Sequence, residues 1–253
     1  MSTRGIADVV FCLDASASMQ PCIEAVKRHI SDFITGLTSN GQQKWDLRLD
    51  FVAHQTAESG SGGTVFQDRS VFHDECHAAL YGGFMQGGGR FFTADQGQFQ
   101  SGLSKVVCQG DEVMLVALDF CLDFPWRPAK ECHRVVIMLT DEPAETGSIV
   151  PEQKAKVADL IKKVQDQRVM LFLVAPDSPI YQELASADKS EYEVVDDAQT
   201  GRGLAGVEFR KVLEYIGKSV SVSANQGAPE AKVQRGLFGQ KSWVACGGSF
   251  TGR

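Results

Sequence analysis

The sequence lacks any apolar run long enough to cross a membrane, and its first ten residues lack the basic and apolar regions of a signal peptide. A spanning helix needs about 20 consecutive apolar residues, and a secretory leader needs both of those regions. The seven cysteines are odd in number and form no CxxC pair, which is typical of reduced thiols rather than of a disulfide framework. These absences predict a soluble cytoplasmic protein.

The chain also lacks an excess of positive charge. Its 25 Lys and Arg residues are outnumbered by 32 Asp and Glu, so the formal net charge is −7. Nucleic acids and anionic membranes are bound largely through clustered Lys and Arg side chains. The charge balance therefore argues against both as partners and favours cationic ligands.

The length and composition fit one large α/β domain followed by a tail. The 253 residues are 43% hydrophobic and 23% charged, which is ordinary for a globular protein. Apolar periodicity stops near residue 222, and residues 223–253 are rich in small and polar side chains. We expect a domain over 1–222 and a tail that is either flexible or a short docking peptide, the latter suggested by Leu237, Phe238 and Trp243.

Apolar patterning predicts strands that alternate with helices along the domain. The expected strands are 8–13, 47–54, 135–139, 169–175 and 191–195, and the expected helices are 23–37, 95–107, 112–122, 151–164, 179–187 and 205–219. A weaker alternation at 64–74 suggests one antiparallel edge strand. This order predicts a three-layer α/β/α fold with a doubly wound, mainly parallel sheet.

Two acidic loops follow strands of this predicted sheet. Asp14, Ser16 and Ser18 come directly after strand 8–13, and Asp141 comes after strand 135–139. Ligands of open parallel sheets gather at the carboxyl ends of the strands, and hard cations prefer oxygen donors. We therefore expect these side chains to hold a divalent cation, with Mg²⁺ favoured and Mn²⁺ as the alternative.

The same two loops carry a family resemblance. The run DVVFCLDASASM is similar to the DxSxS signature of von Willebrand factor A domains, and VVIMLTDE resembles their second acidic loop. The resemblance covers residues 7–220 in element order and implies a metal-ion-dependent adhesion site that binds a partner protein without catalysis. Among family members, the chain looks most like bacterial tellurite-resistance and stress-operon A domains, which are often encoded beside kinases and phosphatases.

One departure from the family pattern changes what the resemblance implies. The family takes a third direct ligand, a threonine, from an intermediate loop, and the corresponding stretch QGDEVMLVAL contains none. Glu112 falls at the threonine position, and Asp111 is its neighbour. We expect Glu112 to coordinate the cation and to weaken the dependence on a partner's carboxylate, with Asp111 as the alternative ligand.

Other interpretations of the acidic loops stay open. Asp14 could serve as the nucleophile of a Mg²⁺-dependent phosphatase, but such enzymes need a second Asp two residues later, where this chain has Ser16. The fold could also have lost its metal, with Ser16 and Ser18 merely capping the next helix. The zinc-capable run His73–His77 contains no HExxH order, so an exposed loop or strand is favoured there.

Overall fold

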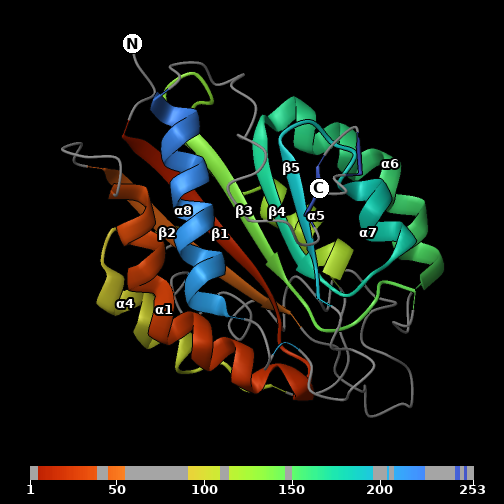
Figure 1. The fold of residues 1–253 in the computed structure, drawn as a ribbon, viewed down its shortest axis with the longest axis horizontal. Coiled ribbons are helices and arrows are strands. Elements are labelled where there is room, and N and C mark those ends of the chain that lie inside the picture. The colour runs from red at the N-terminus through yellow and green to blue at the C-terminus, as the bar shows by residue number, and fades with distance from the viewer. Residues whose placement is uncertain are drawn as a thin grey trace.

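A sheet of five parallel strands forms the centre of the protein, shown as a computed structural model in Figure 1. The structure describes residues 5–38, 45–54, 91–108, 114–145, 150–195, 204, 208–225, 243–245 and 248–249. The parallel strands are β1 (Ile6–Asp14), β2 (Asp46–His54), β3 (His133–Leu139), β4 (Val169–Ala175) and β5 (Ser190–Val194). Their spatial order is β2-β1-β3-β4-β5. The five strands predicted over 8–13, 47–54, 135–139, 169–175 and 191–195 are confirmed, each within two residues at either end.

Helices cover both faces of this sheet, as the three-layer prediction requires. A short 3₁₀ turn, η1 (Ala17–Met19), precedes α1 (Gln20–Thr38). The others are α4 (Gln96–Leu103), α5 (Met114–Leu122), α6 (Val150–Gln167), α7 (Pro179–Leu184) and α8 (Phe209–Asn225). None of the described helices is long and apolar enough to cross a membrane.

The two faces of β1 show how the core is divided between the layers. Phe11 and its alternate neighbours pack with α1, α4 and α8, whereas Val10 and Cys12 pack with α5, α6 and α7. Successive side chains of a strand point to opposite faces, and strands buried on both faces are continuously apolar. The apolar runs in β3 and β4 have this character, which is why they were recognisable from the sequence.

Two helices are shorter than the sequence predicted. The helix expected over 95–107 ends at Leu103, and the one expected over 179–187 ends at Leu184. In the first case the chain leaves the helix at the run Lys105-Val106-Val107, where β-branched residues have low helix propensity. Apolar periodicity alone therefore overestimated the length of this helix.

At the edges of the sheet, one predicted strand cannot be compared with the structure, and two short strands were not predicted. The antiparallel edge strand predicted at 64–74 lies outside the described residues. Two short segments from the C-terminal region, β6 (Trp243–Ala245) and β7 (Gly248–Ser249), pair in antiparallel orientation beyond β5. The main body of the fold is therefore the all-parallel five-stranded sheet and its two helical layers.

Helices α1 and α8 lie so close that their backbones touch. A Cβ atom on Gly217 would lie 2.3 Å from the carbonyl oxygen of Phe33, and one on Gly36 would lie 2.2 Å from that of Glu214. Real Cβ contacts are essentially never shorter than 3.0 Å. Glycine at both positions is therefore what allows the two helices to pack at this distance.

We expect Gly217→Ala to destabilise the protein by about 1–3 kcal/mol, because the new methyl group would force the α1 and α8 backbones apart. The free energy of unfolding in urea measures the change. Gly97→Ala is the matched control, since its Cβ would meet only a side-chain oxygen of Asp95 at 3.2 Å. Equal stability of the two variants would contradict the close-packing explanation.

Candidate cation site

The candidate site lies where the direction of the strand order reverses. β1 pairs with β2 on one side and with β3 on the other, all in parallel. Loops that leave β1 and β3 therefore run to opposite faces of the sheet, and ligands of open α/β sheets bind in the crevice that this creates. The register pairs Leu13 with Leu139, so Asp14 and Thr140 are the next residues on neighbouring strands.

Hydrogen bonds join the two acidic loops across this switch point. The Thr140 hydroxyl donates to Asp14 Oδ2 at 2.8 Å, and the Ser16 backbone N–H donates to Asp14 Oδ1 at 2.7 Å. The Ser18 hydroxyl donates to Asp141 Oδ1 at 3.0 Å, and Ser16 Oγ lies 3.1 Å from Ser18 Oγ. The structure thus brings together four of the five predicted site residues, all of them oxygen donors.

Burial makes this oxygen cluster electrostatically unfavourable when it is charged. The Asp14 side chain has no exposed surface and that of Asp141 is almost fully buried. Burial raises the pKa of Asp14 to about 6, and the negative charge of Asp141 contributes in the same direction. Burial likewise raises the pKa of Asp141. A cation between the two carboxylates would relieve both effects.

The other end of β1 provides an internal comparison. Asp8 is also fully buried, but Arg48 and Arg127 form ion pairs with it at 2.6 and 2.7 Å. Burial raises the pKa of Asp8, and the hydrogen bonds from the two guanidinium groups outweigh it, so the net pKa is below its usual value. Among the ion pairs of the described residues, none involves Asp14 or Asp141. The protein thus neutralises one buried carboxylate with its own arginines, whereas the described residues show no such cation for the other two.

The hypothesis that Ser16 and Ser18 merely cap the next helix agrees with only part of the structure. Ser16 does precede the turn η1, and its carbonyl accepts the Met19 N–H at 3.1 Å. Its side chain, however, makes no capping hydrogen bond and instead lies beside the Ser18 hydroxyl. Helix capping therefore does not account for the Ser16 hydroxyl, and the Ser18 hydroxyl donates to Asp141.

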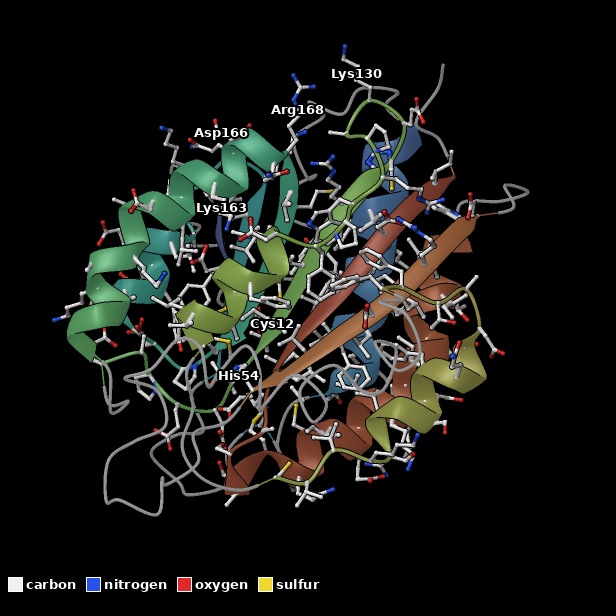
Figure 2. All side chains as sticks on the ribbon, turned by 180° about the vertical axis from the view of Figure 1, so that it is seen from behind. Cys12, His54, Lys130, Lys163, Asp166 and Arg168 are labelled. Carbon is white, nitrogen blue, oxygen red and sulfur yellow. The ribbon has the colours of Figure 1, made fainter. Side chains whose placement is uncertain are left out.

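Two residues of the site were missed by the sequence analysis. Thr140, in the loop that follows β3, was assigned no role, although its hydroxyl donates to Asp14 and also accepts the Glu142 backbone N–H at 3.2 Å. His54 ends β2 directly beside Asp14, and its carbonyl accepts the Ala15 N–H at 2.8 Å. The sequence did carry a signal for His54, because it is the last residue of the predicted strand 47–54 and so lies at the same edge of the sheet as Asp14. Figure 2 shows His54 at this end of the sheet.

The His54 side chain supplies no positive charge here. It is completely buried, and burial lowers its pKa to about 3. A histidine with such a pKa stays neutral at physiological pH. It cannot replace the missing counter-charge of Asp14.

Two thiols lie within the electrostatic influence of the acidic cluster. Burial raises the pKa of Cys108 to about 11, and the negative charges of Asp14 and Asp141 contribute in the same direction. The pKa of the Cys22 thiol is raised well above its usual value, mainly by burial and further by the same two carboxylates. Both thiols are therefore protonated at neutral pH and poorly nucleophilic. Cys22 is buried in the core, and Cys108 is partly buried.

Two candidate ligands, Asp111 and Glu112, lie outside the described residues. The run His73–His77, which was expected to be an exposed loop or strand, lies outside them as well. Within the described part of the chain, no group of three or more His, Cys, Asp or Glu side chains is arranged to hold a metal ion. The described site therefore consists of two carboxylates and three hydroxyls, and any third acid must come from another segment.

Comparisons with known proteins identify the fold. No family model matches the sequence, and no curated protein matches it. A von Willebrand factor type A structure from Catenulispora acidiphila is similar with a TM-score of 0.51 at 14% identity, over 86% of this chain and 43% of that one. Proximal thread matrix protein 1 from the mussel byssus gives a TM-score of 0.44 at 11% identity, over 86% and 49% of the two chains.

The chain thus spans less than half the length of either similar structure. At this level of identity the likeness concerns the fold and not the ligand or partner. The narrower resemblance to tellurite-resistance and stress-operon A domains stays a prediction. The described part of the chain is similar in fold to a von Willebrand factor type A structure.

Proposed function

We propose that this protein is a non-enzymatic interaction module that binds Mg²⁺ through Asp14, Ser16, Ser18 and Asp141 and uses the bound ion to bind a partner protein. The observation that carries the proposal is the pair of buried carboxylates, joined to serine hydroxyls and without an ion pair among the described residues. Burying charge is costly unless an opposite charge is present. A divalent cation would supply it.

The donor set favours a hard cation. All the side-chain donors are carboxylate or hydroxyl oxygens, which suit Mg²⁺ and Mn²⁺ better than softer metals. Two carboxylates balance the charge of one divalent ion, whereas hydroxyls are weak ligands that leave its coordination open to a stronger donor. An acidic side chain would complete the shell, and it can come from a partner protein or from Glu112 of this chain.

The partner in this proposal is an intracellular signalling protein, with a kinase or phosphatase encoded nearby as the expected class. The fold is similar to that of a von Willebrand factor type A structure. This similarity supports an interaction role. The described cysteines are free thiols. The odd number of cysteines and the lack of a CxxC pair support the cytoplasmic location included in this proposal.

The alternative of a phosphatase that uses Asp14 as its nucleophile is less compatible with the site. Both Asp14 oxygens already accept hydrogen bonds, and the side chain has no exposed surface. A nucleophile must reach its substrate. Magnesium-dependent hydrolysis of a generic phosphate ester, abolished by Asp14→Asn, would nevertheless replace the interaction proposal with the enzymatic one.

We expect MgCl₂ to raise the melting temperature of the wild type, by the equivalent of about 2.7 kcal/mol at one hundred times the dissociation constant. The effect should shrink as the pH falls below about 6, because a proton on Asp14 competes with the cation. Asp141→Asn should lose the response yet melt higher than the wild type in EDTA, since it removes the repulsion between the two carboxylates. Differential scanning calorimetry measures both effects.

The control for this experiment is Asp159→Asn, which removes an exposed carboxylate from α6. It should respond to MgCl₂ as the wild type does. A wild-type protein without any Mg²⁺-dependent stabilisation at neutral pH would refute the proposed cation site.

We expect Glu112→Thr to bind Mg²⁺ more weakly than the wild type. At about 4 Å and an effective dielectric constant near 20, a carboxylate adds attraction of the order of 4 kcal/mol before its own desolvation is subtracted. Isothermal titration calorimetry with MgCl₂ compares the two proteins, and Asp111→Thr tests the neighbouring acid in the same way. Tighter binding by Glu112→Thr would overturn the assigned role.

The interaction role predicts a partner that is retained only with the cation. Immobilised wild-type protein should capture it from native extract in MgCl₂ and release it in EDTA. Asp141→Asn should fail to capture it, whereas Asp159→Asn should succeed. Recovery of only EDTA-insensitive proteins would show that the partner does not depend on the metal.

A further inference from the structure

Asp50 is a buried carboxylate that takes no part in the proposed cation site. It lies on β2, is 2% exposed, and is paired in the sheet register with Val10 of β1. Paired residues of neighbouring strands point to the same face, and Val10 packs with α5 and α6. Figure 2 looks onto this face of the sheet, where Cys12 is labelled. Asp50 therefore places a carboxyl group in an apolar layer, which is costly without a compensating interaction.

Two arginines at this face of the sheet are bonded to a different carboxylate. Arg48, two residues before Asp50 on β2, donates to both oxygens of Asp8 at 2.8 and 2.6 Å, and its guanidinium lies 4.6 Å from the centre of the Phe92 ring. Arg127 donates to Asp8 Oδ1 at 2.8 Å. The ion pairs formed by the described residues do not include Asp50.

The other titratable side chains of the elements packed around Asp50 bring no positive charge to it. Cys12 of β1 and Cys121 of α5 are thiols, and burial raises the pKa of Cys121 well above its usual value. His54 at the end of β2 is fully buried, and burial lowers its pKa to about 3. Segment 91–93 has no titratable side chain. The charged groups of α5, its following loop and α6 pair with one another, namely Asp119, Asp123, Lys156 and Lys163.

Both oxygens of Asp50 accept hydrogen bonds from backbone N–H groups. Oδ1 accepts the N–H of Phe51 at 2.8 Å, and Oδ2 accepts that of Phe92 at 2.8 Å. The first of these bonds is local, whereas the second joins β2 to a segment 42 residues further along the chain. Asp50 therefore connects segment 91–93 to the sheet.

Segment 91–93 covers part of the edge of the sheet. β2 is the outermost strand on this side, and Leu49 and Thr93 form an antiparallel bridge in which each N–H donates to the carbonyl of the other at 2.8 Å. Phe92 has a φ angle of 64°, which costs free energy in a residue other than glycine. The bond from Phe92 to Asp50 thus holds a strained segment against the edge strand.

We propose that Asp50 is the catch of a pH-dependent latch, which holds segment 91–93 on β2 while the carboxyl group is protonated and opens more often once it is charged. Opening would break the bridge to Leu49 and expose the backbone groups of this residue at the edge of the sheet. The latch is independent of the cation proposed for Asp14 and Asp141.

The direction of the pH dependence follows from the burial of Asp50. Burial raises its pKa to about 7, although the hydrogen bonds from Phe92 and Phe51 act in the opposite direction. When the segment leaves β2, water reaches the carboxyl group and its pKa returns toward the ordinary value of 3.8. The closed latch therefore binds the proton more tightly than the open one. Its stabilisation by the proton is fully present below the ordinary pKa and is lost as the pH rises through about 7.

The test combines a ¹³C NMR titration of the side-chain carboxyl groups with amide hydrogen exchange of the full chain, both in EDTA between pH 5 and 8.5. The Asp50 carboxyl should titrate near pH 7. The protection factor of the Phe92 amide, which is corrected for the intrinsic pH dependence of exchange, should fall by about tenfold per pH unit up to pH 6.5 and level off above about 7. Amides of β4 report global unfolding and should not follow this profile.

Asp50→Asn keeps a side-chain oxygen that accepts the Phe92 N–H but cannot titrate, so the protection of this amide should no longer depend on pH. Asp159→Asn, which removes an exposed carboxylate from α6, is the matched control and should keep the wild-type profile. The difference between these two variants assigns the pH dependence to Asp50 rather than to the charge of the whole protein.

Three results would overturn the latch. The first is an Asp50 carboxyl that titrates below pH 5, and the second is a Phe92 protection profile that is the same in the wild type and in Asp50→Asn. The third is a loss of Phe92 protection that merely parallels that of the β4 amides. If Asp50→Asn does not fold, the wild-type protein still decides, because Phe92 protection must then follow the titration of Asp50 itself.

Discussion

The parallel pairing of β1 with β3 is the constraint on which the rest of the structure depends. Both strands have apolar central runs, 9–13 and 135–139, that are buried between two helical layers, so their register is set by packing on both faces. That register places Asp14 beside Thr140 at the carboxyl edge of the sheet. The core thereby determines the geometry of the polar loops that follow it.

The two ends of β1 differ in how buried charge is accommodated. At one end Asp8 is neutralised within the protein by Arg48 and Arg127. At the other, Asp14 and Asp141 are held together by hydroxyl groups and have raised pKa values. A protein seldom retains such a pair unless a ligand compensates for it. The difference between the ends supports the assignment of ligand binding to the carboxyl edge.

The opposite edge of the sheet shows a different use of polar residues. There, Arg168 and Lys189 occupy left-handed positions beside a single hollow. At this edge Asp8 also lies between Arg48 and Arg127, whereas the carboxyl edge of the sheet holds Asp14 and Asp141.

The sequence alone determined the five parallel strands, their order with the helices, and the proximity of the two acidic loops. This was possible because buried parallel strands such as 169–175 are unbroken apolar runs, and because Asp14 and Asp141 directly follow such strands. Where helices end at ordinary residues, as α4 does at Leu103, the sequence pattern was too weak to set the boundary. Only the tertiary structure decided that Thr140 holds Asp14, that burial raises the pKa of that carboxyl, and that Arg168 and Lys189 share a hollow. Each depends on contacts between residues distant in the chain, which local sequence patterns do not encode.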